Sequence, residues 1–361
     1  MGGDLSDLVR PEVLAMKAYH VAPARGMVKL DAMENPHSLP GEVARALGER
    51  LAKVEVNRYP DPTAPELKSR LRQAMEIPAH LDLVLGNGSD ELIQMLSLLL
   101  ARPGAVALAP EPSFVMYRMS AAVAGLQYEG VPLGPDFTLD EGAVLAAMER
   151  HHPALTWLAY PNNPTGTLFS RDALLRLIGA APGLVVVDEA YYPFSGGATM
   201  LPELGRFPNL VLVRTVSKLG LAGLRLGVAV GPPAWMAQLE KLRPSYNVNV
   251  LTAAAAEMLL GYRQLFDEQA RAIVAERARL EAALDALPGV RRFPSAANFV
   301  LVRVADAPGA FEALVARGIL VRNLNGSHPL LAHCLRLTVG TADENAKLIE
   351  ALASALAPHH A

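Results

Sequence analysis

The stretch Thr215-Val-Ser-Lys-Leu-Gly-Leu-Ala-Gly-Leu-Arg-Leu-Gly227 directly follows an apolar run, residues 210–214, that is typical of a buried strand. In open α/β sheets, ligands bind in the loops at the ends of such strands. Lys218 can form a Schiff base with an aldehyde there, provided that its pKa is depressed and part of the amine is neutral. Ser217 and Arg225 add a hydroxyl and a guanidinium, which suit a bound phosphate. An exposed loop lysine is the alternative, and groups elsewhere in the chain decide between the two.

Around this stretch, short apolar runs alternate with longer amphipathic stretches. Several runs are β-branched and apolar almost throughout, as in strands that are covered on both faces. The alternation of strand and helix predicts a largely parallel α/β sheet. The expected strands are residues 81–85, 105–109, 155–159, 184–187, 210–214 and 226–230, and the expected helices are residues 90–101, 113–124, 139–149 and 171–180.

The pattern changes after residue 250. Residues 251–287 form a long run of strong helix formers without an internal proline. The first part of the chain is irregular and punctuated by prolines, so we expect it to pack as an arm. We therefore divide the chain into an N-terminal arm with part of a small domain (1–50), a large domain (51–248) and a small C-terminal α+β domain (249–361). In the small domain the expected strands are residues 298–304, 319–321 and 335–339, and the expected helices are residues 308–317 and 343–356.

The composition limits the kinds of function that the chain can have. Its 361 residues suit two domains, and a hydrophobic share of 51% excludes a disordered chain. With 33 basic and 36 acidic side chains there is no positive excess for a nucleic-acid surface. The single cysteine, Cys334, suits a reducing compartment. We see no signal peptide and no apolar stretch long enough for a membrane span, and we expect a cytoplasmic protein.

A second informative motif is Val185-Val-Val-Asp-Glu-Ala-Tyr191, in which a carboxylate ends an apolar strand. Burial of that carboxylate is costly without a cationic partner, and a protonated pyridine nitrogen is such a partner. Asp188 would keep that ring protonated and thus an effective electron sink, and Tyr191 could donate to the ring's phenolic oxygen. An Asp-Glu pair that binds a metal is the alternative, which ranks lower because no phosphate-binding Gly-Lys-Ser/Thr loop accompanies it.

Three further segments place polar or aromatic groups after expected strands. In Tyr160-Pro-Asn-Asn-Pro-Thr-Gly166, two prolines fix a loop that presents Asn163 rigidly, although these are also common turn dipeptides. In Gly86-Asn-Gly-Ser-Asp-Glu91, glycines precede a helix whose N-terminus can bind an anion, or Ser89 and Asp90 can simply cap that helix. Phe114 begins the next helix and could stack on an aromatic cofactor or belong to the core.

In this order the motifs resemble those of the fold-type-I aminotransferases, and more narrowly those of the histidinol-phosphate aminotransferases. Lys29-Leu-Asp-Ala-Met-Glu-Asn-Pro36 and Asn57-Arg-Tyr-Pro-Asp61 also match the narrower group, as does Arg336 in Leu335-Arg-Leu-Thr-Val-Gly-Thr341. The resemblance covers nearly the whole chain. It implies a large domain with a mostly parallel seven-stranded sheet covered by helices, a smaller α+β domain, and pyridoxal 5′-phosphate as the cofactor.

The resemblance also implies roles around the cofactor ring. Lys218 would form the Schiff base and move a proton between the substrate and the cofactor. Asp188 would pair with the ring nitrogen, so that Lys218, Asp188 and Tyr191 are the expected catalytic residues. Asn163 and Tyr191 would hold the ring oxygen, and Phe114 would stack on the ring.

For the cofactor phosphate, the resemblance implies contacts from Ser217, Arg225 and the backbone N–H groups of Ser89 and Asp90. Tyr59 matches a tyrosine that in this family reaches the phosphate of the neighbouring subunit's cofactor. The chain is therefore expected to act as a homodimer.

The expected substrates are histidinol phosphate and glutamate with its oxo-acid, 2-oxoglutarate. Arg336 would bind the α-carboxylate of glutamate. Arg322 and Tyr19 match positions that the narrower group uses for the phosphate of histidinol phosphate, and Asn35 is also expected at the substrate. A guanidinium can accept either anion in bidentate fashion, so one pocket could serve both substrates. No metal is expected.

The first interpretation is therefore transamination of histidinol phosphate with 2-oxoglutarate in histidine biosynthesis. A broad aromatic aminotransferase and a threonine-phosphate decarboxylase on the same scaffold are alternatives. A non-catalytic regulatory protein that binds the cofactor is a third, but the chain has no spare length or basic helix pair for a DNA-binding module.

Overall fold

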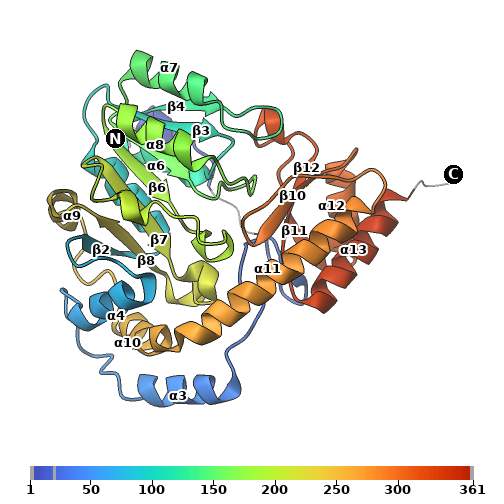
Figure 1. The fold of residues 1–361 in the computed structure, drawn as a ribbon, viewed down its shortest axis with the longest axis horizontal. Helices are drawn as coiled ribbons and strands as arrows, with labels where there is room; N and C mark the ends of the chain where they lie inside the picture. The colour runs from blue at the N-terminus through green and yellow to red at the C-terminus, as the bar shows by residue number, and fades with distance from the viewer. Residues whose placement is uncertain (1–3, 19–21, 358–361) are drawn as a thin grey trace.

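The computed structural model describes residues 4–18 and 22–357, which fold around two sheets (Figure 1). The larger sheet has seven strands in the order β2-β8-β7-β6-β5-β3-β4. Only β8 runs antiparallel to its neighbours, so the mostly parallel seven-stranded sheet is confirmed. The strands are β2 (Asp82–Asn87), β3 (Val106–Glu111), β4 (Gln127–Pro132), β5 (Leu155–Ala159), β6 (Leu184–Asp188), β7 (Leu210–Thr215) and β8 (Leu226–Gly231).

Helices cover both faces of this sheet, which explains why its strands are apolar almost throughout. Successive side chains of one strand enter different clusters: Leu83 and Leu85 face one layer of helices, and Val84 between them faces the other. One layer consists of α4 (Pro65–Met75), α7 (Glu141–His151), α8 (Arg171–Ala180) and α10 (Val250–Leu259), and the other of α5 (Ser89–Leu99), α6 (Val115–Ala124) and α9 (Pro233–Glu240).

The smaller sheet has the order β1-β11-β12-β10-β9 and packs against α12 (Ala307–Ala316), α13 (Ala342–Leu356) and part of α11 (Arg263–Asp285). In Figure 1, α11 crosses diagonally from the larger sheet to the smaller one. This helix therefore contacts both halves of the molecule. The strands are β1 (Val28–Leu30), β9 (Arg291–Arg292), β10 (Phe299–Arg303), β11 (Ile319–Asn323) and β12 (Cys334–Thr338).

Three sequence expectations need correction. The N-terminal 50 residues are not irregular throughout, because β1 pairs with β11 and α3 (Gly41–Leu51) is a regular helix; α1 (Leu5–Leu8) and α2 (Pro11–Ala15) precede them. The run 251–287 is not continuous: a 3₁₀ turn at Leu260–Tyr262, around a glycine, separates α10 from α11. Strand β4 was not expected, because its sequence QYEGVP is polar and its side chains are mostly half-buried. The described part of the chain contains no helix that is long and apolar enough to cross a membrane.

Candidate active site

A cavity of about 430 Å³ lies where the ends of β5, β6 and β7 and the start of α5 meet the smaller sheet. The carboxyl ends of parallel strands meet at one edge of a sheet, which brings together motifs that lie far apart in the sequence. Predicted residues dominate its lining: Ser89, Asp90, Phe114, Asn163, Asp188, Tyr191, Ser217, Lys218, Arg225, Arg322 and Arg336.

Lys218 lies in the short 3₁₀ turn Ser217–Leu219 that follows β7. Its Nζ donates to the Ala32 carbonyl at 3.2 Å and lies 5.7 Å from the centre of the Tyr191 ring. Burial, and next the charge of Arg336, lower the pKa of Lys218 from 10.5 to about 8. The amine is therefore partly neutral near neutral pH, as a lysine that attacks an aldehyde must be.

Asp188 ends β6, and its side chain is buried. The Tyr117 hydroxyl donates to its Oδ2 at 2.8 Å, and the Ala190 N–H donates to its Oδ1 at 3.0 Å. Burial raises the pKa of Asp188 from 3.8 to about 6, against the opposing effect of those two donors. Among the described residues both donors are neutral, so the carboxylate has no cationic partner in hydrogen-bond contact.

Arg336 and Arg322 are paired residues on the neighbouring strands β12 and β11, and both line the cavity. The buried Arg336 side chain donates to Asn163 Oδ1 at 2.6 Å and to the Asp31 carbonyl at 2.8 Å. The smaller sheet thus brings two guanidinium groups to the same side of the cavity and joins one of them to the loop that follows β5.

The opposite side of the cavity is formed by the N-terminus of α5. This helix has no side-chain cap, so neither Ser89 nor Asp90 satisfies its first N–H groups. Gly227 allows β8 to approach the start of α5 closely, since a Cβ at Gly227 would lie 2.7 Å from the Ser89 nitrogen. Gly88 is required as well, because its φ is +81° and a Cβ would lie 2.6 Å from Arg225 Nη2. Arg225 Nη2 also donates to Asp90 Oδ2 at 3.3 Å, so this guanidinium lies beside the uncapped N–H groups, an arrangement that suits an anion.

The remaining predicted groups on the lining are aromatic or hydroxylic. Tyr191 is buried and packs edge-to-face on Phe299, with 5.1 Å between ring centres. Phe114 is half-buried at the N-cap of α6 and meets Tyr117 edge-to-face at 5.7 Å. Ser217 is buried beside Arg225, with its Oγ 2.9 Å from the hydroxyl of Thr215. The cavity therefore joins an anion-binding end to an aromatic and acidic middle.

Comparison with known proteins agrees with this geometry. Residues 25–352 match the family model for class I and II aminotransferases. The chain belongs to this family. It is 57% identical over 348 residues to histidinol-phosphate aminotransferase of Chromobacterium violaceum, covering 96% of this chain and 98% of that protein. It is 55% identical over 357 residues to histidinol-phosphate aminotransferase 1 of Ralstonia nicotianae, covering 98% and 95%.

Among solved structures, this aminotransferase is similar to histidinol-phosphate aminotransferase from Sinorhizobium meliloti in complex with pyridoxal-5′-phosphate. The TM-score is 0.87 at 25% identity, over 96% of this chain and 97% of the other. The fold-type-I architecture and the resemblance to the histidinol-phosphate aminotransferases are thereby confirmed.

Two predicted residues of the aminotransferase, Asn35 and Tyr59, are not on the cavity lining, and a third is not among the described residues. Asn35 is outside the cavity lining: its Nδ2 donates to the Leu219 carbonyl at 3.0 Å and to Gln269 Oε1 at 2.9 Å. Tyr59 is 80% exposed on the surface. Tyr19 lies outside the described residues. The roles assigned to these residues stay predictions.

Sequence reasoning missed Tyr117, which binds the central carboxylate. The signal was in the segment Pro112-Ser-Phe-Val-Met-Tyr117, but a tyrosine on an apolar helix face is ordinarily assigned to the core. It is indeed fully buried and stacks on Trp157, with 4.8 Å between ring centres. Burial first, and then Asp188, raise the pKa of Tyr117, so its hydroxyl stays protonated and donates.

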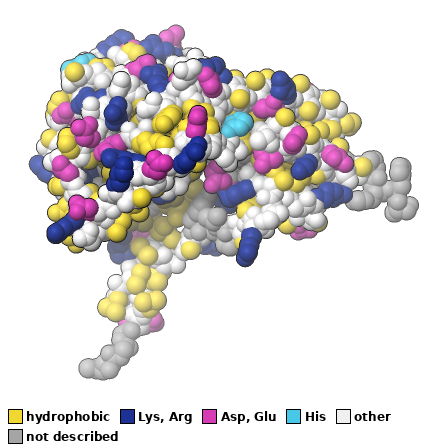
Figure 2. Space-filling model, turned by 90° about the horizontal axis from the view of Figure 1, so that it is seen from below, with side chains coloured by type: hydrophobic (Ala, Val, Ile, Leu, Met, Phe, Trp, Pro, Cys, Tyr) yellow, Lys and Arg dark blue, Asp and Glu magenta, His cyan; other side chains and the backbone are white. Residues whose placement is uncertain are grey.

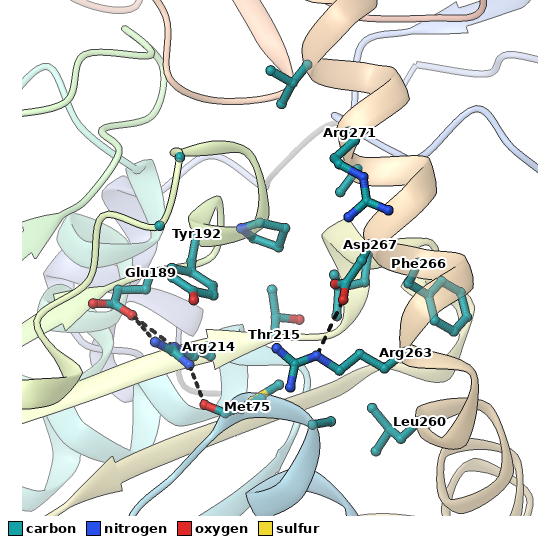
Figure 3. Close-up of a pocket in the computed structure, with 17 residues that line it drawn as sticks. Met75, Glu189, Tyr192, Arg214, Thr215, Leu260, Arg263, Phe266, Asp267 and Arg271 are labelled. Carbon is teal, nitrogen blue, oxygen red and sulfur yellow. Dashed lines mark hydrogen bonds and ion pairs between the residues drawn. The ribbon is translucent and has the colours of Figure 1, made fainter.

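The Asp-Glu metal pair considered for the β6 motif is not formed. Glu189 faces away from the reaction cavity, and Figure 3 shows it bonded to Arg214 at the edge of a second cavity. Within residues 4–18 and 22–357, no group of three or more His, Cys, Asp or Glu side chains could hold a metal ion.

Proposed function

We propose that this chain transfers the amino group of L-histidinol phosphate to 2-oxoglutarate, forming imidazole-acetol phosphate and L-glutamate in histidine biosynthesis. The observation that carries the proposal is the pairing of Arg322 and Arg336 on the lining that also holds Lys218 and Asp188. Histidinol phosphate carries its phosphate, and glutamate its carboxylate, close to the amine-bearing carbon. Two adjacent guanidinium groups can accept either anion in bidentate fashion. The names of the relatives agree with this substrate.

The residues of the reaction cavity fit pyridoxal 5′-phosphate. Asp188 is a buried carboxylate that only neutral groups contact, which suits a protonated ring nitrogen. The uncapped start of α5, with Ser217 and Arg225 beside it, suits the phosphate. Phe114 would stack on the ring, and Asn163 and Tyr191 would hold the ring oxygen. When bound, the cofactor supplies an aldehyde for the amine and a ring that withdraws electrons.

The chain's own groups then bind the substrate and move protons. Arg336 fixes the anionic end of the substrate, and its bond to Asn163 couples that contact to the loop after β5. Nζ of Lys218 takes the proton from the amine-bearing carbon, a task suited to a base whose pKa lies near the working pH. Asp188 would supply the negative charge that pairs with the ring nitrogen of the bound cofactor. Tyr117 acts through Asp188, to which its hydroxyl donates.

We also propose that the enzyme is a homodimer in which Tyr59 reaches the partner's cofactor phosphate. Tyr59 stacks on Tyr246 at 4.6 Å, and both rings are exposed, at 80% and 41%. Figure 2 shows a segment that projects from the molecule with mainly hydrophobic side chains. Exposed apolar residues of the N-terminal α1 and α2, Leu8 and Leu14 among them, agree with a surface that a second copy covers.

Two coarser proposals complete this picture. The division into an arm with part of the small domain (1–50), a large domain (51–248) and a small domain (249–361) is supported by the two separate sheets, although α10 packs in the core of the larger sheet and moves the second boundary beyond Leu259. A cytoplasmic location is supported by the one cysteine, Cys334, which is buried as a free thiol and suits a reducing compartment.

A spectrophotometric half-reaction tests the substrate. Purified holoenzyme is mixed in separate samples with histidinol phosphate, phenylalanine, threonine phosphate and glutamate, each without an oxo-acid. We expect histidinol phosphate and glutamate to convert the spectrum of the pyridoxal form into that of the pyridoxamine form. A faster response to phenylalanine would make the enzyme an aromatic aminotransferase. Release of carbon dioxide from threonine phosphate, without the pyridoxamine form, would make it a decarboxylase.

A further inference from the structure

A second cavity, of about 380 Å³, lies between α11 and the larger sheet (Figure 3). Its walls are the first half of α11, the end of α4, the segment after β6 and the loop after β7. Well-packed interiors leave few voids larger than a water molecule, whereas ligand pockets begin near this size. The space is therefore large enough for a small organic molecule.

This second cavity is separate from the reaction cavity but shares a wall with it. Thr215 lines both. Lys218 lines the reaction cavity, and the next residue, Leu219, lines the second one. The 3₁₀ turn Ser217–Leu219 thus runs between the two spaces. An occupant of the second cavity would contact the backbone that carries the reactive lysine.

The body of the second cavity is apolar. Phe266, Ala270 and Val274 follow one another at helical spacing along α11 and form one wall. Met75 and Pro193 belong to the lining on the opposite side. Gly196 and Gly197 lie in the segment at the edge of the cavity; both have positive φ, and a Cβ at either would meet no atom within 4 Å. An aromatic ring could pack flat against this apolar wall.

Three charged groups of the second cavity lie on the neighbouring stripe of α11: Arg263, Asp267 and Arg271; the other two, Glu189 and Arg214, come from the larger sheet. Figure 3 shows these three side chains extending from α11 toward the side where Tyr192 and Arg214 lie. Arg263 is paired with Asp267 at 3.4 Å and with Glu76 at 2.9 Å.

Two side chains decide which charge the occupant should carry. Arg214 is bonded to Glu189 at 2.7 Å, so that cation is already neutralised. Arg271 makes no hydrogen bond or ion pair with any residue in the described ranges, although it lines the space. Arg271 is exposed to solvent, so the cavity offers an apolar wall with one hydrated guanidinium at its edge that no described side chain pairs.

We infer that this second cavity binds a small aromatic monocarboxylate, with the carboxylate on Arg271 and the ring between Phe266 and Leu219. A guanidinium forms its strongest contacts with a planar carboxylate, which is why this class is preferred over a neutral ligand. Binding alters turnover, because the occupant contacts α11 and the Lys218 turn together. Helix α11 also holds the smaller sheet, through Arg277 Nη1 donating to the Ala297 carbonyl at 2.6 Å.

The test uses the full-length holoenzyme and a matched pair of probes, 2-naphthoate and its uncharged analogue 2-naphthamide, followed by calorimetric titration. We expect one 2-naphthoate per chain and affinity at least about tenfold weaker for 2-naphthamide. Arg271→Ala should weaken 2-naphthoate binding by about tenfold or more. Arg279→Ala is the matched control, since Arg279 is 73% exposed on the same helix outside the lining, and it should leave affinity unchanged.

Several results would overturn the inference. Equal affinity in wild type and Arg271→Ala, or no binding of 2-naphthoate at about 1 mM, would show that the cavity does not select this class. Loss of binding in Arg322→Ala but not in Arg271→Ala would place the probe in the reaction cavity. Protection of 263–274 from hydrogen exchange by dimerisation alone would show that a second copy fills the space.

The effect on turnover is measured separately. In wild type, 2-naphthoate should change kcat for the amino donor without being displaced by it, and the change should be lost in Arg271→Ala. Binding without any change in kcat or KM would disprove the coupling to the Lys218 turn. The titration does not depend on which substrate is turned over, so its outcome is distinguishable from failure of the proposed function.

Discussion

Asp188 and Glu189 are successive buried carboxylates at the end of one strand, yet they have opposite surroundings. Asp188 faces the reaction cavity and receives hydrogen bonds from a phenol and a backbone N–H. Glu189 faces the second cavity, where the Arg214 guanidinium donates to its Oε2 from Nε at 2.9 Å and from Nη2 at 2.7 Å. Thr199 and the Met200 N–H complete its shell.

The difference separates a structural charge from a functional one. A buried ion pair in which both partners are saturated belongs to the fold, and removal of one partner leaves an uncompensated buried charge. A buried carboxylate with only neutral donors is costly in the free protein and acquires its partner from a ligand. On this view the end of β6 holds Asp188 for the cofactor and Glu189 for stability.

The largest expected effect is the loss of activity in Asp188→Asn. Without the carboxylate the ring nitrogen loses its anionic partner, and we expect kcat to fall by at least about 10²-fold, a penalty of about 3–5 kcal/mol for a buried charge left unpaired.

The cofactor-free variant should be no less stable than wild type at neutral pH. Because burial raises the Asp188 pKa from 3.8 to about 6, the folded state binds the proton more tightly, and stability falls as pH rises between those values. Steady-state turnover and thermal melts measure the two quantities, and a strongly destabilised cofactor-free variant would contradict the comparison.

Glu189→Gln should show the reverse pattern. It leaves Arg214 buried without a counter-charge, so we expect the free energy of unfolding to fall by about 3–5 kcal/mol. At temperatures where the variant is folded, kcat should change much less than in Asp188→Asn. Urea unfolding of the cofactor-free protein, with Glu141→Gln on an exposed pair as control, provides the measurement. A kcat loss as large as that of Asp188→Asn, in a protein of normal stability, would erase the distinction.

Only half of this distinction could be predicted from the sequence: the motif assigned Asp188 to the ring nitrogen, but nothing indicated that Glu189 pairs with Arg214. The pattern Val185-Val-Val-Asp-Glu marks both carboxylates as ending a buried strand, and strand alternation places them on opposite faces. Which carboxylate meets a guanidinium and which meets a phenol depends on where Arg214 and Tyr117 lie. Those residues come from another strand and from a helix, and no local pattern identifies them as partners of the carboxylates.

The strands of the larger sheet were predictable for a related reason. Runs such as Leu184–Asp188 are buried on both faces, and burial forces an apolar sequence. Strand β4 is at the edge of the sheet, where burial imposes no such pattern, and it escaped prediction. Asn35 was predicted at the substrate from its motif alone. Its amide instead connects the segment after β1 to Leu219 and α11. A short motif does not reveal which neighbour a side chain contacts.

Tyr117→Phe sharpens the comparison with a smaller change. The substitution removes the donor to Asp188 Oδ2 but keeps the ring that stacks on Trp157. A hydrogen bond to a charged group contributes about 1.5–3 kcal/mol, so we expect the cofactor to bind about tenfold more weakly or worse. Equilibrium dialysis against the cofactor measures this directly. Tyr128→Phe is the matched control, because that half-buried tyrosine faces Glu111 outside the cavity, and equal losses in both variants would make the Tyr117 contact merely structural.

The smallest expected effect concerns the amine that faces Asp188 across the reaction cavity. Burial, with Arg336, lowers the Lys218 pKa from 10.5 to about 8. The charged amine therefore destabilises the folded state below about pH 8, and this destabilisation disappears as the pH rises from about 8 to 10.5. The rate at which the cofactor-free enzyme captures pyridoxal phosphate should follow the neutral amine, rising about fivefold between about pH 7 and about pH 8 and then levelling off. N-α-acetyl-lysine under the same buffers corrects for the cofactor's own titration. Arg336→Met should move the midpoint upward, since Arg336 is the second cause of the depression. A capture rate that keeps rising toward the pKa of an ordinary lysine would show that Lys218 is not tuned by its surroundings, and Asp188 would then be the only one of these two groups whose pKa the site adjusts.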